Sequence, residues 1–186
     1  MSSKAAVGAI ELSSIGVGYQ VQDDLLKSAN VDLLVARTIC AGKYLIIVAG
    51  TVSDVETALD TARAVGKDAV VDSLVVSNIH PAVFPAITQS VVLSPEEIGA
   101  LGIVETFSAS SAMVAADVAA KAASVTIFRL SLAMAMGGKG LLMMTGSVAD
   151  VEAAVHAAAA AVAEHGLLVS TTVIPRPSKE LFTDYI

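Results

Sequence analysis

Tryptophan is absent from this 186-residue chain, cysteine occurs once, and only 16% of the residues are charged. A single cysteine cannot form a disulfide within the chain, so the sequence fits a reducing compartment. The apolar fraction is nevertheless 55%, supplied mainly by Ala, Val, Leu, Ile and Met. This composition excludes an intrinsically disordered chain.

An uninterrupted apolar run of about 18 residues, the length needed to cross a bilayer, is also missing. The best candidate, Leu130 to Met136, is preceded by Arg129 and ended by Gly137-Gly138-Lys139. The N-terminus has no charged start followed by an apolar signal core. We therefore expect a soluble, cytosolic protein that does not enter a membrane and buries its surplus apolar surface in an oligomer.

Basic residues are scarce: 11 Lys and Arg stand against 18 Asp and Glu, which gives a net charge of -7. Binding of nucleic-acid backbones depends on clustered Lys and Arg. The charge balance therefore argues against a nucleic-acid partner.

What the sequence does contain is an internal duplication, which changes every later inference. Val7-Gly-Ala-Ile-Glu11 matches Leu101-Gly-Ile-Val-Glu105, and the Asp-x-x-x-Lys of the first copy recurs in the second. Gly50-Thr-Val-Ser-Asp-Val-Glu56 matches Gly146-Ser-Val-Ala-Asp-Val-Glu152. The second copy carries two extra residues just before its Gly138-Lys139, which places the only length change in a loop.

Each copy reads as strand, helix, strand, strand, helix, strand. This βαββαβ order is a ferredoxin-like arrangement, an antiparallel sheet with helices on one face. Thr51 with Asp54, and Ser147 with Asp150, are typical of a helix start. In the first copy we expect strands at Ala5–Leu12, Val31–Ile39, Lys43–Ala49 and Ala69–Ser77, and helices near Tyr19–Ala29 and Val52–Val65.

The apolar pattern is interrupted between the copies by Ser94-Pro-Glu-Glu97. Proline and clustered polar residues are typical of a connection between domains. We predict a first domain over residues 1–90, a linker over 91–99 and a second domain over 100–186.

Catalytic patterns are absent, so we expect no enzyme. His80, His156 and His165 are scattered, and no HExxH motif, nucleophile elbow or spaced Cys/His set occurs. Glu11 and Glu105 recur in both copies, which favours a structural role. A small-molecule-binding enzyme or sensor on the same scaffold stays an alternative, because fold does not fix function.

Two loops between strands are candidate sites. Cys40 lies before Gly42-Lys43 at an expected loop tip, but one thiolate cannot hold an iron-sulfur cluster, which normally takes four cysteines. By itself such a cysteine is typical of a small buried hydrophobe. The second-copy loop comprises Met134, Ala135, Met136, Gly137 and Gly138; it is a weak match to a phosphate cradle or a soft-metal site.

Taken together, the repeated motifs resemble the shell domain of bacterial microcompartments over nearly the whole chain. The features that carry the resemblance are the opening Gly-x-Ile/Val-Glu strand, Asp117-x-x-x-Lys-Ala-Ala123, the Gly-Lys pair, Gly-x-Val-x-Asp-Val-Glu and the closing Val173-Ile-Pro-Arg-Pro177. The resemblance implies an α/β (α+β) fold of two tandem ferredoxin-like domains. It also implies a homotrimer that imitates a hexamer and tiles, with other shell proteins, into the shell around encapsulated enzymes.

Within this family the chain is most similar to tandem-domain shell proteins of propanediol-utilisation compartments that bind iron and sulfur. The resemblance implies that three copies of Cys40 hold one 4Fe-4S cluster in a central pore, for electron transfer or cluster transport across the shell. Those proteins carry proline at the position of Ala41. An unmetallated pore that conducts small metabolites is the alternative. The expected pore loop comprises Thr38, Ile39, Cys40, Ala41 and Gly42.

The same resemblance implies a set of residues at the edge of the tile. In the first copy the closing motif is Asn78-Ile-His-Pro81, so His80 takes the place of Arg176. We expect Lys27, Lys121, His80 and Arg176 to make tile-to-tile contacts. The exchange of His for Arg is hypothesised to make one type of edge either weaker or pH-sensitive.

Overall fold

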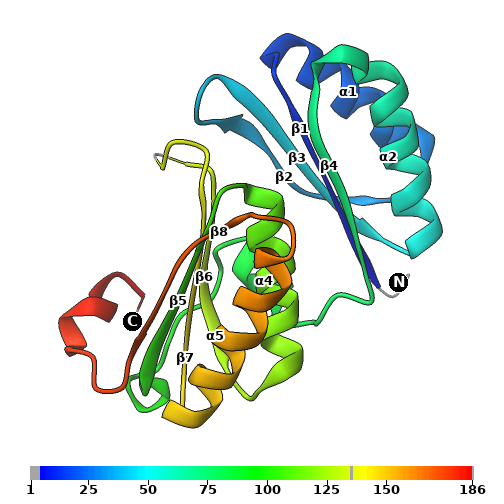
Figure 1. Ribbon diagram of the computed structural model, residues 1–186. Helices are drawn as coiled ribbons and strands as arrows, with labels where there is room; N and C mark the ends of the chain where they lie inside the picture. The colour runs from blue at the N-terminus through cyan, green and yellow to red at the C-terminus, as the bar shows by residue number, and fades with distance from the viewer. Residues whose placement is uncertain (1–4, 135, 186) are drawn as a thin grey trace. The chain divides into compact units, whose positions relative to one another are not determined.

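The computed structural model describes residues 5–134 and 136–185, and these form two compact units that divide between Ile79 and His80 (Figure 1). Each unit has its own four-stranded antiparallel sheet. The βαββαβ order expected from the repeat is therefore present in both copies.

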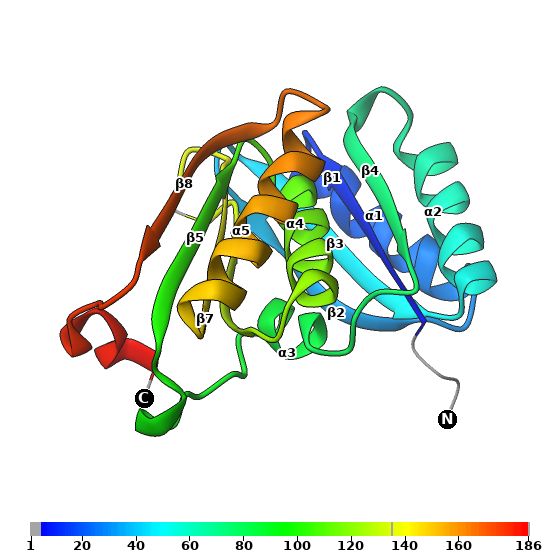
Figure 2. The ribbon, with the colours of Figure 1, turned by 60° about the horizontal axis from the view of Figure 1, so that its bottom comes forward.

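The first unit contains the elements β1 (Ala6–Leu12), α1 (Ile15–Ser28), β2 (Asp32–Ile39), β3 (Lys43–Gly50), α2 (Val52–Gly66) and β4 (Val70–Ser77). Its strand order is β2-β3-β1-β4, so the two central strands are the first and third in sequence. Figure 2 shows α1 and α2 side by side on one face of this sheet. Ile10, Leu25, Ile46 and Leu59 are fully buried between the helices and the sheet.

The second unit repeats this arrangement with β5 (Ala100–Thr106), α4 (Ala109–Ala122), β6 (Thr126–Leu132), β7 (Gly140–Gly146), α5 (Val148–Ala163) and β8 (Leu168–Ile174). The strand order is β6-β7-β5-β8. It also includes a short helix, α3 (Val83–Ile87), which packs against α4. A final 3-10 turn, Lys179–Tyr185, brings Phe182 against Phe128 of β6.

The predicted helix starts of α2 and α5 are confirmed. The Thr51 hydroxyl accepts from the Asp54 N–H at 3.2 Å, and the Ser147 hydroxyl accepts from the Asp150 N–H at 3.2 Å. Each cap satisfies one of the first-turn amides that have no partner inside the helix.

Helix α1 begins at Ile15, four residues before the expected Tyr19, with Ser14 as its N-cap. Gly16 and Gly18 weaken a helix prediction because glycine has a poor helix propensity. At Gly18 the reason for glycine is tertiary: a Cβ would lie 2.6 Å from the ring of Tyr44. Gly18 is therefore needed for the packing of α1 onto β3, although the same residue lowers the helix propensity of the sequence.

The segment between the copies, where we predict a linker over 91–99, packs against the second copy. Residues from His80 onward belong to the second unit, and Leu93 is 1% exposed beside Leu101 and Phe182. The Leu93 N–H donates to the Tyr185 carbonyl at 2.7 Å. The segment is ordered because it contributes an apolar side chain and a hydrogen bond to the core of the second unit.

In the part of the chain that the structure describes, no helix is long and apolar enough to cross a membrane.

Glycine at the crossing of β1 and α2 permits a close approach of helix and sheet. A Cβ at Gly8 would lie 2.7 Å from Val55 Cγ1. We expect Gly8→Ala to lower the free energy of unfolding by about 1–3 kcal/mol, because the extra methyl overpacks the core. Chemical denaturation followed by circular dichroism measures this.

Gly16→Ala is the matched control, since a Cβ there meets no atom within 4 Å. It should instead stabilise α1 by about 0.5–1 kcal/mol through helix propensity. Equal stability of the Gly8→Ala variant and the wild type would contradict the packing argument.

Candidate pore loops and tile edge

Cys40 lies at the tip of the hairpin that joins β2 to β3. Ile39 pairs with Lys43, so the loop comprises Cys40, Ala41 and Gly42. Thr38, Ala41 and Gly42 are exposed, Ile39 is buried and Cys40 is half-buried. The structure thus brings the five expected pore-loop residues together at one hairpin end, with one thiol near the tip.

Two consecutive residues of this loop have left-handed backbone, with φ of 63° at Ala41 and 70° at Gly42. Glycine adopts this conformation freely, but an L-residue with a Cβ is strained there by about 1–2 kcal/mol. Proline is fixed near φ −65° and could not replace Ala41 in this backbone. The turn that presents Cys40 is therefore defined by Gly42 and tolerates Ala41.

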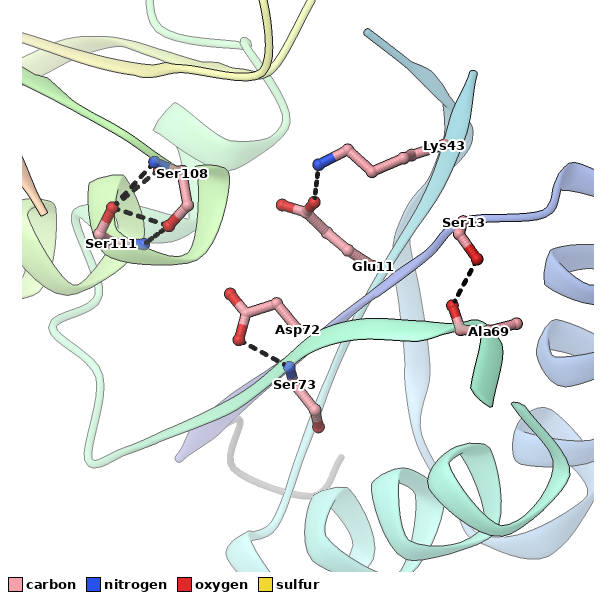
Figure 3. A network of polar contacts seen from close by, with 8 residues as sticks. All are labelled: Glu11, Ser13, Lys43, Ala69, Asp72, Ser73, Ser108 and Ser111. Carbon is pink, nitrogen blue, oxygen red and sulfur yellow. Dashed lines mark hydrogen bonds and ion pairs between the residues drawn. The ribbon is translucent and has the colours of Figure 1, made fainter. Parts of the chain in front are cut away.

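An ion pair anchors the base of the loop to the centre of the sheet (Figure 3). The Lys43 Nζ lies 2.5 Å from Glu11 Oε2, and the Glu11 side chain is only 2% exposed. Glu11 points from β1, and Lys43 begins β3 directly after Gly42. The repeated Glu and the repeated Gly-Lys are therefore partners, which explains why the copies share both.

The second-copy loop follows a different course. Ala133, Gly137 and Gly138 have positive φ, and the Ala133 N–H donates to the Lys139 carbonyl at 3.1 Å. Met134 is 47% exposed, Met136 is half-buried, and Ala135 lies outside the described residues. This longer loop supplies a thioether where the first loop supplies a thiol.

The base of the second loop has the equivalent ion pair, but its two side chains are more exposed to solvent. Lys139 Nζ lies 2.9 Å from Glu105 Oε1, with side chains 41% and 31% exposed. Hydrogen bonds from Lys139 and then Ser170 lower the pKa of Glu105 below its usual value. These contacts confirm a structural role for the repeated glutamates.

The two lysines that we expect at the tile edge each pair with an aspartate one helical turn earlier. Lys27 Nζ is 2.5 Å from Asp23, and Lys121 Nζ is 2.6 Å from Asp117. The hydrogen bond from Lys27 to Asp23, followed by the charge of Asp23, raises the pKa of Lys27. Both ammonium groups lie on exposed helix ends, where they can meet another molecule.

His80 lies beside the second of these pairs. Its backbone N–H donates to Asp117 Oδ1 at 2.7 Å, while Lys121 donates to Oδ2. The imidazole folds back, and its Nδ1 accepts from the Ala82 N–H at 3.3 Å. Arg176, the counterpart of His80, is exposed after the end of β8.

Sequence reasoning missed the contact between His80 and Asp117. The only signal for it was the repetition of Asp23 and Asp117 ahead of the paired lysines. Asp117 is 6% exposed as a residue, and a buried carboxylate needs partners that a sequence pattern does not identify.

No group of three or more His, Cys, Asp or Glu side chains that could hold a metal occurs among residues 5–134 and 136–185. His156 and His165 are exposed on and after α5. Cys40 is the single cysteine of the chain.

Replacement of Lys43 tests the anchor of the Cys40 loop. We expect Lys43→Met to lower the free energy of unfolding by on the order of 3 kcal/mol, because it leaves the Glu11 charge buried without its partner. Lys139→Met is the matched control and should cost no more than about 1 kcal/mol, since that pair is solvated. Urea unfolding at pH 7 measures both, and equal losses would contradict the difference in burial.

A family model for the BMC domain matches this chain twice, over residues 6–79 and 100–177. The two matches coincide with the two four-stranded sheets. The duplication seen in the sequence is therefore a duplication of one known domain.

Two relatives extend this result. The chain is 44% identical over 181 residues to the bacterial microcompartment shell protein PduT of Citrobacter freundii, covering 97% of each chain. It is 30% identical to the carboxysome assembly protein CcmO of Synechococcus elongatus, covering 95% of this chain and 67% of that one.

Solved structures of microcompartment proteins are also similar to this chain. A microcompartment protein from Desulfitobacterium hafniense DCB superposes with a TM-score of 0.92 at 38% identity, covering 96% of this chain and 98% of that one. The fused permuted hexameric shell protein MSM0275 of the RMM microcompartment gives a TM-score of 0.60 at 26% identity, covering 86% and 82%. With both domains matched and a full-length relative at 44% identity, the chain belongs to the bacterial microcompartment shell proteins as a tandem BMC-domain member, a structural shell component and not an enzyme.

Proposed function

We propose that this protein is a shell tile built from three copies of the chain, with a central pore lined by the Cys40 loops and closed by a 4Fe-4S cluster. The observation that carries the proposal is the position of the chain's one cysteine at the tip of the β2–β3 hairpin. The tile is expected to join other shell proteins and to face encapsulated enzymes on its inner side.

Two tandem copies of one domain support a ring of three chains. Three chains supply six similar domains, which can surround one axis as six subunits of a hexamer would. Such a ring is a closed form with many edges for lateral contacts, and edge lysines on both copies fit that use.

The residues present fit a cluster shared among chains. A 4Fe-4S cluster normally takes four cysteine ligands, and one chain offers one. A three-fold axis brings three Cys40 thiolates together and leaves one iron for water or an outside ligand. When bound, the cluster would supply one-electron redox chemistry at the pore.

The chain's own residues determine how that thiol is presented. Gly42 forms the left-handed turn, and Lys43 fixes the base of the loop to Glu11. Lys43 is already paired within the sheet, so its ammonium is held back from the loop tip. Electron transfer across the shell and delivery of the cluster to enzymes inside both fit this arrangement.

A second candidate keeps the tile and leaves the pore unmetallated, so that small metabolites pass through it. The observation that favours it is the small size of the loop side chains, since Ala41 and Gly42 stand beside Cys40 at the exposed tip. The same tile and the same edge contacts serve both candidates.

Lateral assembly depends on the edge lysines. We expect the wild type to form sheets or tubes visible by negative-stain electron microscopy, and Lys27→Glu or Lys121→Glu to disperse them, because reversal of charge opposes close packing of edges. Lys67→Glu, which makes the same change at an exposed position after α2, should leave the sheets intact. A wild type that stays a discrete particle under every condition would contradict the tile.

Iron and sulfide content tests the cluster. Anaerobic purification should yield about four irons and four acid-labile sulfides per three chains, with an EPR signal after dithionite, because one cluster is shared by three thiolates. Cys40→Ser should lose all three signals and keep the oligomer. Carefully anaerobic wild type without iron would overturn the cluster and favour the open metabolite pore.

A further inference from the structure

The two Asp-Lys pairs of this protein have different surroundings, although the repeat makes them equivalent. The Asp117 side chain is 9% exposed, and its two oxygens accept from Lys121 and from the His80 N–H. The Asp23 side chain is 61% exposed. Within the described residues, the only hydrogen-bond partner of the Asp23 carboxylate is Lys27.

His80, which donates its N–H to Asp117, lies in the segment directly after the first repeat. His80 follows Ile79, where the first match to the BMC domain ends. The segment is held in a turn, since Ala82 N–H donates to the His80 imidazole and Val83 N–H to the His80 carbonyl. The turn directs the His80 N–H at a carboxylate on the first helix of the second repeat.

The equivalent segment after the second repeat begins at Arg176. Pro177 matches Pro81, and Arg176 matches His80, so the closing segment keeps a backbone N–H at the same place. Arg176 is exposed and carries a positive charge. Asp23 and its neighbour Asp24 give the first helix of the first repeat the opposite charge.

We propose that Asp23 is the docking site for Arg176 of a second copy of this chain. The Arg176 backbone N–H donates there to the Asp23 carboxylate, as the His80 N–H does to Asp117 within one chain. The inference rests on the proposed tile and supplies a residue pair for its subunit contact. The guanidinium stays available for contacts between tiles.

This contact is of the head-to-tail kind. Each chain contributes a donor from the end of its second repeat and an acceptor from the start of its first, so the two surfaces differ. Heterologous contacts of this kind generate closed rings when the rotation closes. The Asp23–Lys27 pair, which is weak while solvated, becomes covered and strengthened only when a second chain is bound.

Site-specific crosslinking tests the pairing. In a Cys40→Ser background, a chain with Asp23→Cys is mixed with a chain with Arg176→Cys and treated with a short bismaleimide. We expect covalent dimers from the mixture and no dimers from either chain alone. A chain with both changes should give closed covalent oligomers, whereas the matched control with Asp24→Cys and Arg176→Cys should give fewer.

A second variant measures the energetic effect. Asp23→Ala should raise the concentration at which the oligomer half-dissociates by roughly ten- to a hundredfold, because a hydrogen bond to a charged group is lost. It should also speed amide exchange in the peptide around Arg176 and not in the one around His80. Asp117→Ala should do the reverse, with faster exchange around His80 and an unchanged oligomer.

The outcomes separate this contact from the tile itself. An oligomer that forms sheets but gives no crosslink, and that Asp23→Ala leaves equally stable in sedimentation, would overturn the Asp23–Arg176 contact and leave the shell tile standing. A wild type that is monomeric and never forms sheets would overturn both.

Discussion

The ion pair between Glu11 and Lys43 is the contact on which the candidate pore depends. It joins the last part of the central strand β1 to the first residue after the Cys40 loop. A glutamate that is 2% exposed is tolerated only with a charged partner, so the pair specifies the register of β1 against β3. Lys43 is also the residue that pairs with Ile39 across the β2–β3 hairpin, so the ion pair holds one end of the three-residue loop that contains Cys40.

In the second copy the equivalent ion pair is less buried, and the loop beside it differs. Lys139 and Glu105 keep the same contact but are more exposed, and the loop above them is two residues longer. Insertion in a surface loop costs little, while insertion in a paired strand would shift every side chain to the other face. Each copy therefore keeps the same sheet topology, while the loops of the two copies differ in length and in side-chain chemistry.

The Asp-Lys pair on the first helix of each copy also combines an ion pair with a position for a further partner. An aspartate placed one turn before a lysine holds the ammonium at the helix end, and the same carboxylate has a second oxygen for a neighbouring backbone. Within the chain, His80 uses that oxygen of Asp117. The start of the connection between the repeats is thus held by a helix of the second repeat, and His80 belongs to the second unit.

The sequence alone determined the duplication, the βαββαβ order and the family, because repeated motifs and alternating apolar runs are local properties of the chain. It also determined the caps at Thr51 and Ser147, whose side chains bond to amides three residues away. Tertiary structure alone decided the early start of α1, since the need for Gly18 comes from the ring of Tyr44 on another element. It likewise decided the partners of Glu11 and Asp117: a carboxylate in a strand or helix shows nothing locally of the distant lysine or backbone amide that the fold brings within hydrogen-bond distance.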